Sequence, residues 1–252
     1  MRYVHSINMR FCDVVERSAF TFIHLHDVCK NDDGEENDTT IIMKILLAVT
    51  GSVAAIKSPE IAVRLVRELN ATVQVLLTVG GKNFWEKAIA YDGQYWESLI
   101  EEQERGTITI LYAQDEWNDW NELGDDVLHI NLRDWADCLL IAPLSAHTLA
   151  KIANGLCDDT LSCVARAWDF GHGIRQAKPM ILAPAMNTAM WEHPLTQPQL
   201  QTIQGFSTTT RNNNNSVTIV EPQVKTLACG ETGNGALASV DDILLAVSNI
   251  VI

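Results

Sequence analysis

Apolar runs of strand length alternate with amphipathic segments from Lys44 to the end of the chain. Between the first two runs, Ile61, Leu65 and Leu69 recur at fourfold spacing, which places them on one face of a helix. Continuous apolar strands joined by helices are typical of a parallel sheet covered on both faces, so the pattern predicts a single, doubly wound α/β domain. The predicted strands are Ile45–Val49, Val73–Thr78, Thr107–Leu111, Cys138–Ala142, Met180–Ala183 and Val217–Val220.

Further helices are predicted at Thr148–Ala153, Leu161–Trp168 and Asp241–Val251. The first is followed by a glycine that suits a helix end, and the last begins with two aspartates that suit a helix start. Two polar segments fit the sheet poorly and are interpreted as surface loops: the acidic, tryptophan-rich Asp115–Asp126, and Ser207–Ser216 with its run of asparagines.

The first part of the chain lacks this alternation. Residues 1–42 have no sustained period and include the acidic, polar segment 31–38, which offers little apolar surface for burial. We therefore expect residues 1–42 to be a poorly ordered N-terminal extension and residues 43–252 to be the folded domain. Met43 directly precedes the first predicted strand and is a candidate start for a shorter product.

Composition narrows the classes of function. The chain of 252 residues is 47% hydrophobic and carries a formal net charge of −14, which disfavours binding to nucleic acid because the surface repels polyanions. It has no apolar stretch near the roughly 20 residues that cross a bilayer and no signal-peptide pattern, so no membrane segment and a cytoplasmic location are predicted. Six cysteines lie without CxxC pairs, so neither a zinc site nor a disulfide framework is expected.

Two predicted strands end in turns suited to an anion. Gly51, Ser52 and Val53 lead from the first strand into a helix, a geometry that presents free amides and a hydroxyl. The run is neither GxGxxG nor a P-loop, so it indicates a mononucleotide phosphate, or else an ordinary tight turn. Ser145 and Thr148 follow another strand; they would flank the same crevice, although either residue also suits a plain helix cap.

Three other sequence features offer candidate chemistry. Asn187 lies among prolines, methionines and a tryptophan in Pro184–Trp191 and either donates to a carboxylate or caps the next helix. His129 precedes the strand that feeds the crevice and is either a proton carrier or a satisfied side chain. Cys229 lies in the glycine-rich segment Leu227–Ala238, which is either a lid over the site or a surface loop.

Four of these motifs, in this order, resemble those of the homo-oligomeric flavin-containing cysteine decarboxylases: the turn at Gly51, the segment His129–Asp137, the PxMNxxMW motif at Pro184–Trp191 and the cysteine segment Ala228–Ala238. The resemblance implies a Rossmann-like flavoprotein fold that binds FMN. The implied FMN contacts are Gly51, Ser52, Val53, Thr78, Phe84, Ser145, Ala146, His147, Thr148 and Ala183.

The resemblance also implies the activity, which is decarboxylation of 4'-phosphopantothenoylcysteine in coenzyme A synthesis. The flavin would oxidise the substrate thiol to a thioaldehyde, so that the carboxylate can leave as carbon dioxide, and would then return the electrons. His129 would carry a proton in the oxidative half and Cys229 would supply one in the reductive half. The implied substrate contacts are Asn187, Met190, Thr226, Leu227 and Ala228. A homotrimer with active sites between subunits is implied as well.

Departures from the family and competing functions remain. His147 stands where the family has Asn, which puts the hydrogen bonding of that turn in question. Extra residues around Tyr91–Arg105, 170–176 and Arg211–Ser216 are interpreted as loop insertions. The alternatives are a peptidyl-cysteine decarboxylase, a prenyl-FMN synthase, and an inhibitory subunit of a serine/threonine phosphatase. The cysteine segment favours decarboxylation of 4'-phosphopantothenoylcysteine over these alternatives, and the chain lacks the long acidic C-terminal tail of the phosphatase regulators.

Overall fold

The computed structural model describes residues 29–30, 36–37, 42–117, 120–207, 216–226 and 232–250. The chain divides into two compact units, residues 1–41 and residues 42–252. In the first unit, strands β1 (Cys29–Lys30) and β2 (Glu36–Asn37) pair antiparallel. Apart from Ile42, the rest of the predicted N-terminal extension lies outside the described residues.

The larger unit is built on a six-stranded parallel sheet with the order β5-β4-β3-β6-β7-β8. Its strands are β3 (Lys44–Val49), β4 (Thr72–Leu77), β5 (Ile108–Tyr112), β6 (Cys138–Leu144), β7 (Met180–Pro184) and β8 (Val217–Ile219). All six predicted strands are confirmed, and so is the doubly wound α/β fold. The strand order reverses between β3 and β6, and such a switch point is where ligands bind in open α/β sheets.

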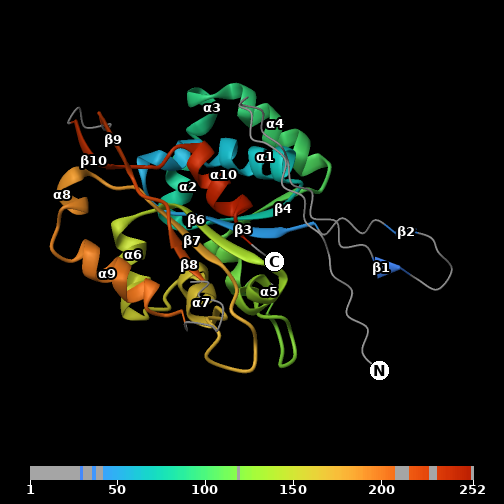
Figure 1. The fold of residues 1–252 in the computed structure, drawn as a ribbon. Coiled ribbons are helices and arrows are strands. Elements are labelled where there is room, and N and C mark those ends of the chain that lie inside the picture. The colour runs from blue at the N-terminus through green and yellow to red at the C-terminus, as the bar shows by residue number, and fades with distance from the viewer. Residues whose placement is uncertain are drawn as a thin grey trace, which may run out of the picture. The chain divides into compact units, whose positions relative to one another are not determined.

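The helices cover both faces of the sheet (Figure 1). The unit contains α1 (Ser58–Leu69), α2 (Val79–Trp85), α3 (Ala88–Tyr91), α4 (Gly93–Glu104), α5 (Leu128–Trp135), α6 (Ala146–Asn154), α7 (Thr160–Ala167), α8 (Thr188–Trp191), α9 (Thr196–Gln204) and α10 (Val240–Ser248), with 3₁₀ turns η1 (Val53–Lys57) and η2 (Ala113–Trp117). The four helices expected from the sequence are confirmed as α1, α6, α7 and α10, and Gly155 ends α6 with a φ of 71°.

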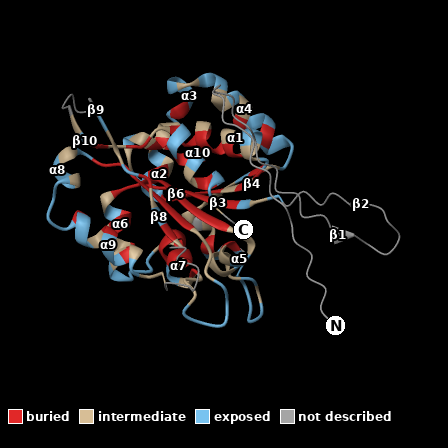
Figure 2. Cartoon of the chain, viewed as in Figure 1, coloured by how far each residue is buried: buried red, intermediate tan, exposed pale blue. Residues whose placement is uncertain are grey.

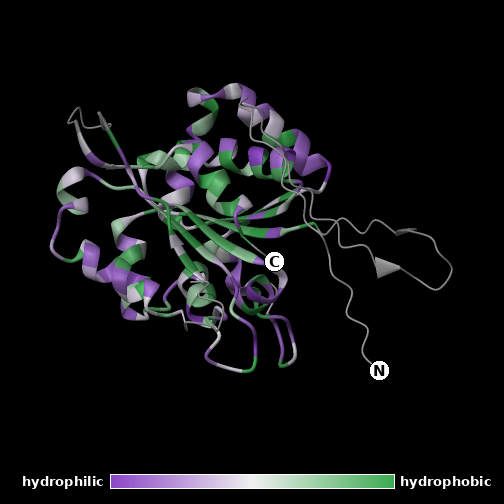
Figure 3. Cartoon of the chain, viewed as in Figure 1, coloured by the Kyte–Doolittle hydropathy of each residue, from purple (hydrophilic) through white to green (hydrophobic). Residues whose placement is uncertain are grey.

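Each face of the sheet has its own hydrophobic core. Ile45, Leu47 and Val49 of β3 pack with residues of α1, α4 and α10, whereas Leu46 and Ala48 pack on the opposite face with residues of α5, α6, α7 and α9. The strands are accordingly buried in Figure 2 and hydrophobic along their length in Figure 3, while the helices expose polar faces. Burial on both faces explains why these strands lack polar alternation.

Two loop interpretations were wrong. Most of the segment Tyr91–Arg105 forms α4, which Asp92 caps by accepting hydrogen bonds from the Gln94 and Tyr95 amides. The segment Asp115–Asp126 begins inside η2, where Glu116 is buried with 8% of its surface exposed. Much of the rest of this segment is exposed as predicted, including Trp117 (62%), Trp120 (43%) and residues 121–124. Of Ser207–Ser216, residues 208–215 lie outside the described part of the chain.

Candidate active site

Four strand-to-helix turns line the carboxyl edge of the sheet, and in each a side chain caps the following helix. They follow β3, β4, β6 and β7, and each capping oxygen accepts a hydrogen bond from a backbone amide in the first turn. The pairs are Ser52 Oγ with Ala54 N (3.4 Å), Thr78 Oγ1 with Gly81 N (3.1 Å), Ser145 Oγ with Thr148 N (3.3 Å) and Asn187 Oδ1 with Met190 N (3.1 Å). Polar, small residues therefore gather where the fold places a ligand.

The two central turns are tied together at the switch point by Thr50, which is fully buried. Its hydroxyl donates to the Pro143 carbonyl (2.7 Å) and accepts from the Ser145 amide (2.8 Å). The Thr78 hydroxyl likewise donates to the Val49 carbonyl (3.1 Å). The ends of β3, β4 and β6 are thus held in one arrangement by side-chain hydroxyls.

Glycines bring the first two turns close together. A Cβ on Gly51 would lie 3.2 Å from Gly80 Cα, and a Cβ on Gly80 would lie 2.9 Å from Gly51 Cα. A Cβ on Gly81 would lie only 2.1 Å from the Val49 carbonyl oxygen. The close backbone approach requires glycine here. Gly51 is exposed and Val53 is 47% exposed, while the Ser52 amide donates to the Thr50 carbonyl (2.8 Å).

The electrostatics of this edge favour an anion. No acidic side chain lies in the first turn of η1, α2, α6 or α8, although the chain carries a net charge of −14. Helix N-termini offer free amides and a partial positive charge. The residues at these turns therefore fit the phosphate of a mononucleotide such as FMN, as the turn at Gly51 suggested.

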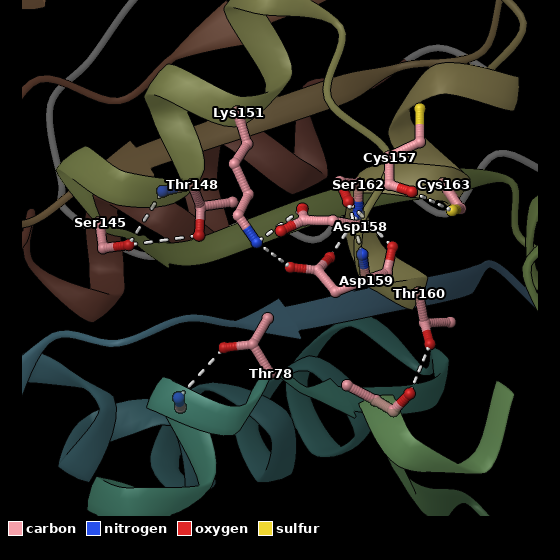
Figure 4. A network of polar contacts seen from close by, with 12 residues as sticks. Thr78, Ser145, Thr148, Lys151, Cys157, Asp158, Asp159, Thr160, Ser162 and Cys163 are labelled. Atoms are coloured by element: carbon pink, nitrogen blue, oxygen red, sulfur yellow. Dashed lines mark hydrogen bonds and ion pairs between the residues drawn. The ribbon is translucent and has the colours of Figure 1, made fainter.

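The other predicted FMN contacts occupy the same edge with different exposures. Thr148 is buried and its hydroxyl accepts from Ser145 Oγ (3.3 Å), as Figure 4 shows. Ala183 is fully buried in β7, and Ala146 is half-buried at the start of α6. Phe84 of α2 is half-buried, and His147 is exposed on α6. Farther along α6, Figure 4 shows Lys151 paired with Asp158 and Asp159, both at 2.8 Å.

The predicted substrate residue Asn187 lies beside a hairpin formed by β9 (Gln223–Thr226) and β10 (Thr232–Ala236). The Met186 amide donates to the Gly235 carbonyl (2.9 Å), and a Cβ on Gly233 would lie 2.2 Å from Thr188 Oγ1. The hairpin backbone therefore packs directly against the segment that carries Asn187. The cap uses Asn187 Oδ1, and no hydrogen bond among the described residues occupies Nδ2, which is left to donate to a ligand.

Met190 is 53% exposed on α8, next to Asn187 in the same turn. Thr226 is the last residue of β9. The other predicted residues of this segment, Leu227, Ala228 and Cys229, lie outside the described residues, so the roles assigned to them stay predictions.

His129 lies near the start of α5, and the structure pairs it with a residue that the sequence did not reveal. Its Nδ1 is 2.5 Å from Glu116 Oε1, across two segments that are 13 residues apart. Because α5 leads into the start of β6, its first residues lie toward the carboxyl edge, as does η2 after β5. Within the described part of the chain, no hydrogen bond joins His129 to Asn187.

Three cysteines of the described residues, Cys138, Cys157 and Cys163, are free thiols. Burial raises the pKa of Cys138 well above its ordinary range and, together with nearby Cys157, raises the pKa of Cys163 to about 11. Thiols with raised pKa values are poor nucleophiles at neutral pH. Among the described residues there is no cluster of His, Cys, Asp or Glu that would hold a metal ion, and no helix long and apolar enough to span a bilayer.

The fold and this edge define an α/β protein built to hold a mononucleotide at its switch point. The Flavoprotein family model matches residues 33–251. The phosphopantothenoylcysteine decarboxylase of Arabidopsis thaliana is 42% identical over 206 residues, which cover 82% of this chain and 84% of that protein. The chain belongs to the Flavoprotein family, within its phosphopantothenoylcysteine decarboxylase branch.

Solved structures agree with this assignment. A cysteine-to-serine mutant of PPC decarboxylase complexed with pantothenoylaminoethenethiol superposes with a TM-score of 0.67 at 40% identity, over 82% of this chain and 97% of that one. The FMN binding protein AtHal3 superposes with a TM-score of 0.65 at 40% identity, over 82% and 95% of the two chains. The family resemblance and the fold inferred from the sequence are thereby confirmed.

Proposed function

We propose that the protein is an FMN-dependent carboxy-lyase that converts 4'-phosphopantothenoylcysteine to 4'-phosphopantetheine in coenzyme A biosynthesis. The observation that carries this proposal is the carboxyl edge of the sheet, where four capped helix starts without acidic residues surround the switch point. Relatives of this chain at about two-fifths identity bear the name of that activity. The substrate is a small molecule.

FMN is held by the turns of that edge. Gly51, Ser52 and Val53 would hold the phosphate at this turn, where the close approach of Gly51 and Gly80 leaves no room for larger side chains. Further contacts come from Thr78, Phe84, Ser145, Ala146, His147, Thr148 and Ala183. Bound FMN supplies a two-electron oxidation of the substrate thiol and later returns the same electrons.

The substrate carboxylate is fixed by Asn187 and Met190. Asn187 Oδ1 is engaged by the Met190 amide, which orients the side chain and leaves the Nδ2 donors for the carboxylate. Thr226 ends the strand β9 of the hairpin that packs on this segment, and Leu227 and Ala228 follow it in the sequence. These residues bind the substrate and exclude water during the reaction.

Two side chains move protons. His129 takes the proton that the thiol loses when the substrate is oxidised to a thioaldehyde. The carboxylate is then β to a C=S group, so the electrons of the C–C bond flow into sulfur as carbon dioxide leaves. Cys229 donates a proton to the resulting enethiolate so that the product can be reduced. No net oxidation remains.

The active unit is a homotrimer in the cytoplasm, with each active site between two subunits. In this arrangement His129, which bonds to Glu116, and Asn187, which lies beside the hairpin, belong to different subunits of one active site. A partner subunit would bring the two groups to one substrate.

The test is product analysis by mass spectrometry after incubation of the FMN-loaded protein with phosphopantothenoylcysteine and, separately, with a peptide that ends in cysteine. We expect phosphopantetheine from the first and an unchanged peptide from the second. Decarboxylation of the peptide alone would replace this proposal with the peptidyl-cysteine activity, and no product from either would refute a decarboxylase function.

A further inference from the structure

The pair of His129 and Glu116 is unusual for a structural contact. Glu116 is 8% exposed and the His129 side chain 20% exposed, and Nδ1 lies 2.5 Å from Oε1. The second carboxylate oxygen, Oε2, is buried and has no hydrogen-bond partner among the described residues. A buried carboxylate that lacks full pairing is costly, so this arrangement does not serve stability.

A second buried acid in the same chain shows what a structural carboxylate looks like. Glu102 is 2% exposed, and both its oxygens are bonded: Oε1 to Arg67 and Arg105, and Oε2 to the Thr107 hydroxyl. Among the residues that the structure describes, the Glu116 carboxylate bonds only to His129. The Glu102 carboxylate therefore holds two helices together, whereas the Glu116 carboxylate is directed at one imidazole.

The backbone on the Glu116 side of the pair is held in place by neighbouring groups. The Thr160 hydroxyl at the start of α7 donates to the Ala113 carbonyl of η2 (2.9 Å), and the Asp115 carboxylate accepts from the Tyr112 amide (2.9 Å). Figure 4 shows Thr160 in this contact. With η2 fixed against α7, Glu116 has a defined position from which to orient His129.

We propose that Glu116 is a positioning residue for His129, whose neutral ring it holds with the proton on Nδ1 so that Nε2 is the basic nitrogen facing the substrate. A carboxylate only accepts hydrogen bonds, so Nδ1 must donate. A histidine base works through the nitrogen opposite its orienting carboxylate, which also stabilises the imidazolium that forms. Among the described residues, Nε2 has no partner. This inference rests on the proposed function.

The two hydrogens that the substrate loses on oxidation go to different places. Oxidation of the substrate thiol to a thioaldehyde removes a hydride, which bound FMN would accept, and one proton, which His129 Nε2 would take. The Nδ1 proton stays between His129 and Glu116, and no proton is transferred to the carboxylate. Glu116 therefore contributes orientation and charge and is not itself a catalytic residue.

The first test reads the tautomer directly and needs no substrate. Long-range ¹H–¹⁵N correlation of histidine-labelled holoprotein distinguishes a protonated Nδ1 from a protonated Nε2. His129→Asn identifies the resonances of His129 among the seven histidines. We expect neutral His129 to carry its proton on Nδ1, and Glu116→Gln to lose this preference, since an amide can donate as well as accept. Glu122→Gln, which alters an exposed acid of the same connecting segment, should leave the spectrum unchanged.

The second test is the rate at which substrate bleaches the flavin without oxygen. Glu116→Gln should slow this step by about 10²-fold, the lower end of the effect of general acid–base catalysis, while Glu122→Gln keeps the wild-type rate. In a His129→Asn background, Glu116→Gln should cause no further loss, because the carboxylate acts only through the imidazole. Should the Gln variant fail to fold, Glu116→Asp, which retracts the carboxylate by one methylene, provides the same comparison.

The assignment would be overturned if neutral His129 in the wild type were protonated on Nε2, or if Glu116→Gln bleached at the normal rate. It would also be overturned if Glu116→Gln lowered the bleaching rate equally in the wild-type and His129→Asn backgrounds. A wild-type protein that binds FMN yet never bleaches would instead refute the proposed function. The tautomer measurement would then still decide whether Glu116 orients His129.

Discussion

The hydroxyl of Thr50 accepts a hydrogen bond from the Ser145 amide at 2.8 Å and donates one to the Pro143 carbonyl at 2.7 Å. These contacts join residues about 95 positions apart and lie between β3 and β6, where the order of the strands reverses. The two turns that would hold FMN are therefore fixed relative to one another by one fully buried side chain.

Thr50→Val should destabilise the protein and weaken FMN binding together. Valine keeps the shape but leaves a buried amide and a buried carbonyl without the hydroxyl, at a cost of about 2 kcal/mol. Thermal unfolding should show a Tm lower by about 4 to 8 °C. Thr50→Ser retains the hydroxyl and should retain most of the stability. Equal Tm values for Thr50→Val and the wild type would show that the hydrogen bonds of the Thr50 hydroxyl do not stabilise the protein.

Gly51→Asp should abolish FMN retention while leaving a folded protein. The added Cβ meets Gly80 at 3.2 Å, and the new carboxylate sets like charge against the phosphate. The flavin absorbance of the purified protein measures the loss. Gly173→Asp adds the same charge in open space and should remain yellow. A yellow Gly51→Asp protein would place the phosphate elsewhere.

Glu102→Gln should lower stability by about 2 kcal/mol at neutral pH, because it removes charged hydrogen bonds to Arg67 and Arg105. Burial alone raises the pKa of Glu102, but its hydrogen bonds from Arg67 and Thr107 outweigh burial and hold the pKa below its ordinary value. The ionised Glu102 carboxylate therefore contributes its full stabilisation above its unfolded pKa of about 4.3. This stabilisation is lost as the pH falls through the lower pKa that Glu102 has in the folded protein.

Denaturant unfolding of wild type and Glu102→Gln from pH 7 to pH 3 measures this difference. The difference between their free energies of unfolding should shrink as the pH falls into the acid range. The control is Glu101→Gln, which alters the exposed carboxylate that pairs with the same Arg67 and should change stability by well under 1 kcal/mol. A gap that persists unchanged at pH 3 would contradict the assigned titration.

Much of the fold follows from the sequence because its signals are local. The run Ile45–Val49 is apolar at every position, which is typical of a strand buried on both faces. Ser145 and Asn187 are capping residues directly after strands, so their turns were also predictable. Helix α4 was missed because it buries few residues, among them the charged Glu102 beside Leu99, and its packing depends on α1.

The partner of His129 could not be predicted for a similar reason. Glu116 lies in a strongly acidic, tryptophan-rich run that is typical of an exposed loop. Its burial depends on η2 being fixed by the Thr160 hydroxyl of α7, a contact between residues 47 positions apart. A single sequence carries no local signal for a contact of that kind.

Cys229→Ser should separate the two halves of the reaction. A hydroxyl is far less acidic than a thiol, so the variant should bind FMN, oxidise the substrate and release carbon dioxide but fail to supply the later proton. Mass spectrometry should find a product two hydrogens lighter than phosphopantetheine. Ordinary phosphopantetheine at the wild-type rate would remove Cys229 from the mechanism.

The central claim is that decarboxylation here is redox-neutral and depends on FMN. The most direct measurement is anaerobic turnover of carboxyl-labelled phosphopantothenoylcysteine by the FMN-loaded protein, with carbon dioxide and phosphopantetheine quantified together and no external oxidant or reductant. The account predicts one carbon dioxide for each phosphopantetheine over many turnovers, with the flavin oxidised at the end. Labelled substrate that is recovered intact, while the protein retains its FMN, would contradict it.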